Sequence, residues 1–389
     1  MSQLQYSEIQ PDNNRSTYNP LDVVNFTLNN QGRSLVLGSL RLEGTLKVSI
    51  NSNKNRATTE DIRFNKNAGI GAFIEGISVA SALNGTMENI QFDYARYLNM
   101  VAIASKDAND SFGSAEVCEL RAPDDLMTSR YCYGNVSTAS TQGEADNMDF
   151  SHKMKICLNR AVEGDNLPFS RSGFMKISVS LARNFSAFYG SFQTAGDATK
   201  QITTTNYELT DLTITYQTIP DVGQKNPVVM RTIVPIKSTL ESDFSNIASS
   251  VPAKCDAVSI SYQFTERENQ VVDIAGNPQI WDNSALNNVP NWDSIQYIFN
   301  NSNSEYISYI IDQEQEAVRR GIESLKDSGH NQVSLDNLHS NDSLIHGLSF
   351  GEMIDLSNQR FNIQVATTGG ILSTRKMTIY CYFHSLINA

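Results

Sequence analysis

The strand pattern in the middle of the chain is repeated at its C-terminus. Residues 174–181 alternate apolar and polar side chains, a polar interval follows, and residues 212–219 alternate again. Near the end, residues 361–365 alternate, a break rich in Gly and Thr follows, and residues 377–383 form a closing apolar-rich segment. Period-two alternation is typical of half-buried β-strands. Two similar endings predict two similar β domains in tandem, and this organisation favours a structural role.

Length and composition agree with two ordered domains. The 389 residues fit two domains of roughly 150–200 residues each. The apolar fraction of 40% and the charged fraction of 19% are typical of globular protein. No apolar run approaches the ~18 residues that cross a bilayer. The N-terminus has no basic start or apolar stretch typical of a secretory signal, so we expect synthesis and folding in a cytoplasm.

The charge of the chain argues against direct contact with nucleic acid. The formal net charge is −12, and Arg15 and Arg33 are the only cations among the first 34 residues. Proteins that bind nucleic acid directly use clustered Lys and Arg to displace counterions from phosphates. The sequence therefore predicts no direct sequence-specific nucleic-acid binding.

Composition also marks the expected domain boundaries. Residues 1–20 are rich in Gln, Asn, Ser and Pro, and we expect an extended N-terminal arm with little core of its own. The first β domain is expected over 21–220. Residues 221–227 contain turn formers and a Pro directly after a closing strand, which predicts a linker. The second β domain is expected over 228–389.

One helix is predicted in the second domain, over about 304–326. Its apolar residues recur at steps of three and four, as on one face of a helix. Two interpretations fit this face: packing across its own β domain, or an interface with a neighbouring subunit. The residues that form it are Ile307, Ile310, Ile311, Val318, Ile322 and Leu325.

Catalytic, metal and cofactor motifs are absent from the sequence. There is no phosphate loop, nucleophile elbow or zinc signature. His330, His339 and His346 lie near one another, but their polar context predicts solvated side chains. The five cysteines lack a Cys-x-x-Cys pair, and Cys157 and Cys381 lie in strand-like runs, which favours small buried hydrophobes. We therefore expect no catalytic residue, metal or cofactor.

The two tryptophans flank a loop before the predicted helix. Trp281 and Trp292 suit a recognition site for a sugar or protein, or they anchor a long loop against the domain. The pattern favours the anchor interpretation.

The layout resembles the double jelly-roll major capsid proteins of tailless icosahedral DNA viruses and phages, the lineage of tectiviruses, corticoviruses and adenoviruses. The residues that carry the resemblance are the strands 176–181 with 212–219, the strands 361–365 with 377–383, and the helix 304–326. The resemblance implies an all-β fold of two tandem eight-stranded jelly rolls, each an antiparallel β-sandwich. A helix of similar clarity in the first domain is missing, unless 93–100 or 124–130 supplies it.

The resemblance also implies a function and partners. The chain is expected to form homotrimers whose six barrels make a pseudo-hexagonal capsomer of an icosahedral virion shell. Vertex proteins and membrane-associated capsid proteins are the other implied partners. The N-terminal arm would lie on the inner side of the shell, where Tyr6, Ile9, Tyr18 and Leu21 are candidates for contacts with an inner membrane or a neighbouring capsomer.

Two other classes of protein remain open at this stage. A vertex or minor capsid protein would combine one jelly roll with a spike domain and predicts unlike halves and pentamers. A carbohydrate-binding or receptor-binding β-sandwich would gather exposed aromatic residues at one loop end, with Trp281 and Trp292 as the leading candidates. An enzyme has the least support, because no nucleophile with a partnered base can be named.

Overall fold

The computed structural model describes most of the chain, and the observations below concern the described part alone. The described residues are 3–52, 63–64, 68–91, 93–105, 118–121, 146–160, 165–183, 187–191, 193–194, 197–223, 227–250, 254–265, 279–280, 289, 291–301, 304–325, 345–355 and 360–389. We refer to residues 3–223 as the N-terminal half and to residues 227–389 as the C-terminal half.

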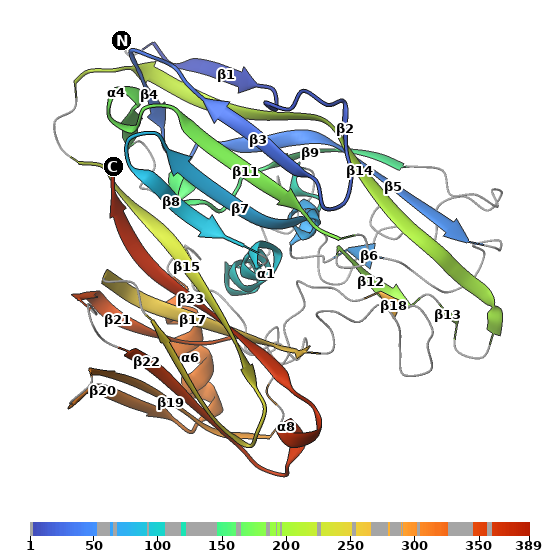
Figure 1. Ribbon diagram of the computed structural model, residues 1–389, viewed down its shortest axis with the longest axis vertical. Helices are drawn as coiled ribbons and strands as arrows, with labels where there is room; N and C mark the ends of the chain where they lie inside the picture. Colours follow the sequence, from blue (N-terminus) through green and yellow to red (C-terminus); the bar gives the residue numbers. More distant parts are fainter. Residues whose placement is uncertain are drawn as a thin grey trace.

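The N-terminal half contains two antiparallel sheets (Figure 1). The first sheet has the order β10-β4-β14-β5-β9, and β1, β2 and β13 also pair with β14. The second sheet has the order β3-β11-β7-β8. The strands of the first sheet are β1 (Gln5–Ile9), β2 (Thr17–Tyr18), β4 (Arg33–Val36), β5 (Arg41–Ser52), β9 (Asp146–His152), β10 (Asn166–Pro168), β13 (Gln193–Thr194) and β14 (Asp197–Pro220), and those of the second are β3 (Val23–Leu28), β7 (Ile74–Ser81), β8 (Gly85–Ile90) and β11 (Met175–Leu181).

The C-terminal half contains two further antiparallel sheets of four strands each, in the orders β15-β23-β17-β21 and β16-β22-β19-β20. Inward-facing apolar residues such as Ile260, Ile363 and Phe383 are buried between them, as the alternating sequence predicts. The strands are β15 (Val229–Leu240), β16 (Phe244–Ser250), β17 (Lys254–Phe264), β19 (Trp292–Asn301), β20 (Ser304–Ile311), β21 (His346–Asp355), β22 (Arg360–Thr367) and β23 (Met377–Asn388).

The two halves repeat one topology. In chain order, β1 with β2, β3, β5, β7, β8, β9, β11 and β14 correspond to β15, β16, β17, β19, β20, β21, β22 and β23. These corresponding strands have the same order in both halves, since β14 lies between β1 and β5 as β23 lies between β15 and β17, while β4, β10 and β13 belong to the first sheet alone. The predicted closing strands are thus confirmed as strands, although β11 and β14 belong to different sheets, as do β22 and β23. This repeat confirms the predicted duplication.

A helix follows the corresponding strand in each half. Helix α1 (Tyr94–Ser105) comes after β8, and helix α6 (Glu314–Ser324) comes after β20. The segment 93–100 therefore supplies the helix that the sequence left in doubt, while 124–130 lies outside the described residues. The remaining short elements are η1 (Gly69–Phe73), η3 (Cys157–Asn159), α4 (Phe169–Ser172), α8 (Ile371–Thr374) and a small sheet of β6 (Arg63–Phe64), β12 (Phe188–Ser191) and β18 (Gln279–Ile280).

The predicted helix over 304–326 is wrong in its first part. Residues Ser304–Ile311 form strand β20, which pairs with β19 in a hairpin from Asn301↔Ser304 to Ile295↔Ile311. The three isoleucines of this segment satisfy helical spacing, but β-branched side chains also suit a strand, and the pairing with β19 decides the outcome. The helix begins only at Glu314.

The predicted N-terminal arm is also corrected. Residues Gln5–Ile9 and Thr17–Tyr18 are strands that pair with β14, so this segment supplies the first strand of the N-terminal repeat. The Arg33 Nη2 atom donates a hydrogen bond of 2.9 Å to the Gln3 carbonyl oxygen and holds the start of the segment. Its polar composition reflects an edge position, since one face of β1 is open to solvent.

Candidate functional site at the junction of the two halves

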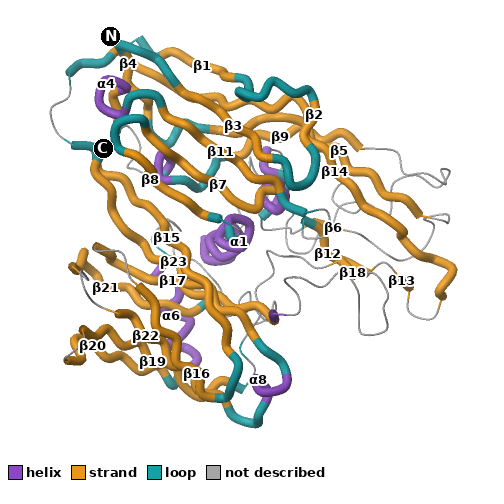
Figure 2. The backbone as a smooth tube through the Cα atoms, viewed as in Figure 1, coloured by secondary structure: helices purple, strands orange, loops and turns teal. Residues whose placement is uncertain are grey.

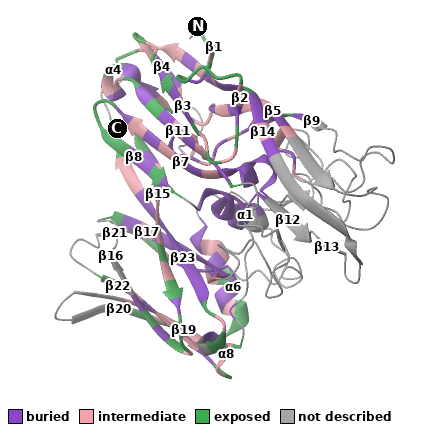
Figure 3. Cartoon of the chain, turned by 45° about the vertical axis from the view of Figure 1, so that its right-hand side comes forward, coloured by how far each residue is buried: buried purple, intermediate pink, exposed green. Residues whose placement is uncertain are grey.

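The two halves meet through a buried junction built around β8 and α1. Figure 2 shows α1 between the upper and lower groups of strands. Strand β8, at the edge of its sheet, contacts β15, and α1 packs on β7 and η1. The apolar core of the N-terminal half continues across this junction and includes Met230, Ile233, Tyr380 and Tyr382 of the C-terminal half. Figure 3 colours the described side of α1 as buried.

Glu88 on β8 is the polar centre of the junction. Its carboxylate forms an ion pair with Arg160, and the two side chains are 0% and 1% exposed. The Cys157 backbone N–H donates to Oε2 at 2.7 Å. From the other half, the Ile233 backbone N–H donates to Oε1 at 2.8 Å, and the Thr232 hydroxyl lies 3.3 Å from the same oxygen. One carboxylate therefore joins β8, η3 and β15.

Burial sets the protonation behaviour of this carboxylate. Removal from water raises the pKa of Glu88 above its usual range, while the Arg160 guanidinium and the backbone N–H donors act in the opposite direction. A buried charge is tolerated when it is paired and its lone pairs are satisfied. The donors around Glu88 pair with its carboxylate oxygens. Because two of these donors belong to the C-terminal half, they also fix how the two halves meet.

Arg96 on α1 forms a second polar contact across the junction. Its Nη1 atom lies 3.1 Å from Asp93 Oδ1, and its Nη2 atom donates at 2.5 Å to Gln263 Oε1 on β17. The guanidinium carbon lies 3.5 Å from the centroid of the Tyr380 ring on β23, a cation–π geometry. Helix α1 is thus fixed to the sheet of the C-terminal half by charge and by stacking.

Aromatic packing completes the junction. The ring centroids of Tyr97 on α1 and Tyr382 on β23 are 5.3 Å apart, and the Arg160 guanidinium lies 5.2 Å from the Tyr97 centroid. These contacts cover residues of β17 and β23 that would otherwise face solvent, so that both faces of these strands are buried. The halves consequently behave as one packed body at this contact.

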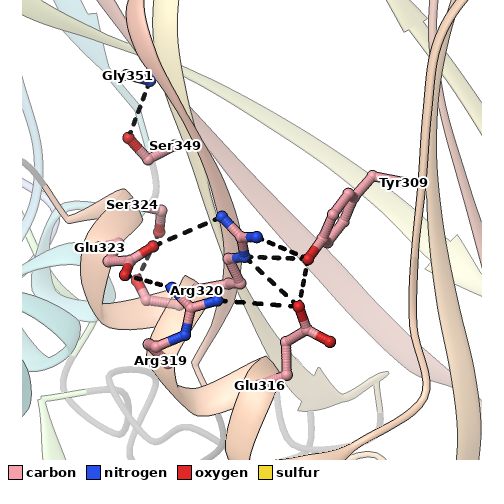
Figure 4. Close-up of polar contacts among 9 residues, drawn as sticks. Tyr309, Glu316, Arg319, Arg320, Glu323, Ser324, Ser349 and Gly351 are labelled. Carbon is pink, nitrogen blue, oxygen red and sulfur yellow. Dashed lines mark hydrogen bonds and ion pairs between the residues drawn. The ribbon is translucent and has the colours of Figure 1, made fainter.

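The other helix, α6, lies against strands of its own half. Helix α6 packs on β21 and β17, and a Cβ at Gly321 would lie 1.9 Å from the Ile345 carbonyl oxygen, so the helix approaches the backbone closely. On its outer side, Arg320 donates to the Tyr309 hydroxyl at 2.8 Å, and Tyr309 in turn contacts Glu316 (Figure 4). The hydrogen bond to Glu316 raises the pKa of Tyr309. This network connects α6 to β20.

The predicted helix-face residues are divided between two elements. On β20, Ile311 is buried and Ile310 is exposed, and the side chain of Ile307 lies outside the described residues. On α6 and its C-cap, Val318 and Leu325 are buried in the core of the junction, and Ile322 packs against it. The second group therefore packs internally, whereas Ile310 faces outward.

The four predicted arm residues also have different environments. Tyr18 is fully buried, and Ile9 packs against the core of the N-terminal half. Tyr6 and Leu21 are exposed, at 73% and 62%. Only these two remain open to a partner.

The tryptophan and histidine predictions have mixed outcomes. Trp292 begins β19 and packs against the apolar cores, with its ring 5.5 Å from that of His346, while Trp281 lies outside the described residues. The prediction of a solvated His346 is wrong, since this side chain is buried and its Nδ1 atom lies 2.9 Å from the Tyr262 hydroxyl. Burial lowers its pKa to about 3. His330 and His339 lie outside the described residues.

A further buried network lies beneath the N-terminal sheets. The Tyr94 hydroxyl is 2.9 Å from His152 Nε2, and His152 Nδ1 is 3.7 Å from Glu119 Oε1. Hydrogen bonding and the charges of His152 and Arg121 lower the pKa of Glu119 to about 2, against the effect of its burial. This Tyr–His–Glu arrangement joins α1 to β9. Among the described residues, no group of three or more His, Cys, Asp or Glu side chains is placed to hold a metal.

Sequence reasoning missed the residues that join the halves. Glu88, Arg96 and Arg160 carry no motif, and each lies among apolar or loop residues that give no sign of a partner far along the chain.

Three cysteines, Cys157, Cys255 and Cys381, are buried; for Cys157 and Cys381 this confirms the prediction. No helix in the described part of the chain combines the length and apolar character needed to cross a bilayer.

Comparison with known proteins agrees with the repeated topology. A chain of the Sputnik virophage cryo-EM structure matches all of this chain and 88% of its own length, with a TM-score of 0.61 and 10% identity. The Faustovirus major capsid protein matches all of this chain and 90% of its own, with a TM-score of 0.60 and 9% identity. The mavirus major capsid protein matches 99% and 90%, with a TM-score of 0.52 and 9% identity.

The fold is a double jelly roll. Each jelly roll consists of two facing sheets whose strand orders recur in the other half, which confirms the fold implied by the resemblance. No family model matches the sequence, and no curated protein matches it. The likeness to the capsid proteins therefore lies in the fold.

Proposed function

We propose that this chain is the major capsid protein of an icosahedral virion. The observation that carries the proposal is the full-length match, over both jelly rolls, to the major capsid proteins of Faustovirus and mavirus. A vertex protein with one jelly roll and a spike would have unlike halves, whereas eight strands correspond here in each half. The function of such a chain is structural, and its place is the virion shell.

We propose a homotrimer as the building block. Two jelly rolls held at a fixed angle in one chain present six similar barrels when three chains meet, and six barrels make a block that tiles a shell. The junction around Glu88 and Arg96 supports this role because it fixes the angle between the jelly rolls. We propose a domain division near residues 221–227, with the first jelly roll extended to include β1 and β2.

Further partners follow from a shell made of such blocks. Vertex proteins would fill the five-fold positions, and membrane-associated proteins would lie beneath the shell. Any contact of the N-terminal segment with an inner membrane would rest on Tyr6 and Leu21, because Ile9 and Tyr18 pack within the chain.

Electron microscopy of the purified chain tests the proposal. We expect blocks of hexagonal outline that form sheets or shells when the protein is concentrated. Pentagonal particles would identify a vertex protein. Single two-lobed particles at high protein concentration would remove the capsid proposal and favour a binding protein.

A further inference from the structure

The turn between β7 and β8 contains an Asn that is followed by a Gly. Asn84-Gly85 is the one Asn-Gly dipeptide in the sequence. Because Gly has no side chain, its backbone nitrogen is open to the carbonyl carbon of the Asn side chain before it. Asn is a thermolabile residue for this reason, since attack by the next backbone nitrogen releases its amide. The dipeptide thus brings a nucleophile and an electrophile together within one turn.

The turn leaves both residues open to water. Residues 82–86 are exposed, and Gly85 has a φ of +70°, as is common for Gly at the end of a three-residue hairpin loop. A Cβ built at Gly85 would meet nothing within 4 Å, so no described part of the chain crowds its backbone. Among the described residues, the side-chain amide of Asn84 has no hydrogen-bond partner, and its backbone N–H donates to Ser81 Oγ at 3.2 Å. Water and the neighbouring nitrogen can therefore reach this amide.

The rest of the loop is held by the segment before β11. The Ala82 N–H donates to the Phe174 carbonyl oxygen at 2.9 Å. The Leu83 N–H donates to the Ser172 carbonyl oxygen at 3.2 Å. Asn84 follows these anchored residues, and rotation of its side chain toward the next nitrogen breaks no hydrogen bond in the described part of the chain. The reaction therefore requires little rearrangement of the fold.

We propose that Asn84 is a site of spontaneous deamidation, which converts the turn to a mixture of isoaspartate and aspartate. The Gly85 backbone nitrogen gives up its proton and forms a bond to Asn84 Cγ, while the bond from Cγ to the side-chain nitrogen breaks. That nitrogen takes up a proton and leaves as ammonia, so a cyclic succinimide remains. Water then opens the ring. Opening at Cγ gives aspartate, and opening at the main-chain carbonyl carbon gives isoaspartate, in which the chain continues through the side chain.

The two products affect the fold differently. Isoaspartate adds one carbon to the main chain directly before β8, the strand that meets the other half. The Met87 carbonyl oxygen accepts a hydrogen bond from the Thr232 hydroxyl at 3.0 Å, and Glu88 Oε1 accepts one from the Ile233 N–H at 2.8 Å. A longer main chain displaces the start of β8 and weakens this contact. Aspartate only adds a charge at an exposed position, where substitutions have small effects.

Storage of the purified full-length protein tests the proposal. Samples are kept at pH 7 and at pH 9, because the backbone amide loses its proton faster in base. Peptide mass spectrometry measures the conversion of each Asn, and labelling by a protein isoaspartate methyltransferase measures the isoaspartate. Asn89 is the internal control, since it is exposed on the same strand but its neighbour Ile90 has a β-branched side chain that shields the nitrogen.

We expect Asn84 to convert while Asn89 stays intact, with faster conversion at pH 9 than at pH 7. The melting temperature of the stored protein should fall as isoaspartate accumulates. An intact Asn84 in the folded protein at both pH values, under conditions that convert it in a urea-unfolded sample, would overturn the proposal, because the turn would then protect the residue. Equal conversion of Asn84 and Asn89 would also contradict it.

Two variants separate the chemistry from its consequence. Asn84→Gln lengthens the side chain by one carbon, which disfavours ring closure, so this variant should keep its melting temperature during storage. Freshly prepared Asn84→Asp carries the charge on an unchanged main chain and should melt like the fresh unmodified protein. A stored Asn84→Gln protein that loses as much melting temperature as the stored unmodified protein would place the damage elsewhere and overturn the role of this turn.

Discussion

Glu88 and Arg160 form an ion pair with almost no exposure to water, and the carboxylate of the same Glu88 accepts a hydrogen bond from the Ile233 backbone of the other jelly roll. The pair thus belongs to the contact between the jelly rolls as well as to the first one. Removing one member of a buried pair leaves the other charge without compensation, and the backbone donor loses its acceptor.

Glu88→Ala should therefore reduce the free energy of unfolding by roughly 3–5 kcal/mol, as expected for a broken buried pair. The control is Glu241→Ala, because Glu241 forms an ion pair with Lys376 at 3.1 Å in which both side chains are more than half exposed. An exposed pair contributes about 0–1 kcal/mol. Urea denaturation of the two variants measures the difference. Equal losses would show that the buried pair does not hold the junction.

Ile311→Asp should prevent stable folding. Ile311 is 1% exposed and belongs to the core of the second jelly roll, so the substitution buries a carboxylate without a partner. The cost of several kcal/mol is a large share of the stability of a domain. Circular dichroism and thermal melting should show loss of cooperative unfolding, in contrast to Ile310→Asp. A folded Ile311→Asp protein would contradict the assignment of residues 304–311 to a strand with this register.

Gly321→Ala should destabilise the protein although alanine favours helices. Alanine in place of glycine stabilises a free helix by about 1 kcal/mol. At this position, however, the added Cβ would lie 1.9 Å from the Ile345 carbonyl oxygen, and backbone must move. We expect a net loss of about 1–3 kcal/mol, typical of overpacking. Gln315→Ala, on the exposed side of α6, is the control and should be near neutral. A more stable Gly321→Ala protein would show that α6 is not seated against β21.

The free energy of unfolding should fall as the pH is lowered, because His346 is buried without a proton in the folded protein. Its folded pKa of about 3 lies below the ordinary histidine pKa of 6.5, so the unfolded chain binds the proton more readily. The contribution is present above pH 6.5 and is lost as the pH falls toward 3. Between pH 7 and pH 5 this group should remove about 2 kcal/mol from the free energy of unfolding.

His346→Gln removes this titration and serves as the comparison. Urea titrations at pH 7 and pH 5 should show a smaller pH dependence in the variant by that amount, since the other titrating groups are common to both proteins. An identical pH dependence would mean that His346 reaches solvent and takes up a proton in the folded state.

The fold was predictable where strands are long and apolar on one face. Residues 175–181, 361–365 and 377–383 all lie within strands, because alternation reports which face is buried. The first third of segment 304–326 was predicted as helix because Ile307, Ile310 and Ile311 have helical spacing. Their β-branched side chains also suit a strand, and only the pairing with β19 decides between the two. The N-terminal strands were missed because an edge strand needs few apolar residues.

The junction could not be predicted from local sequence. Glu88 meets Thr232 and Ile233 only after two jelly rolls have formed and docked, 144 and 145 residues apart along the chain. The same limit hid His346, because only the pairing of β21 with β17 buries this side chain against Tyr262 and Trp292. Long-range packing decides such environments.

The native mass of the purified chain tests the central claim most directly. Multi-angle light scattering on the eluting peak should give three times the chain mass of 43.1 kDa, independent of loading concentration over a wide range. A mass of one chain at every concentration, or a mass of five chains, would contradict the account of this protein as the trimeric block of a capsid shell.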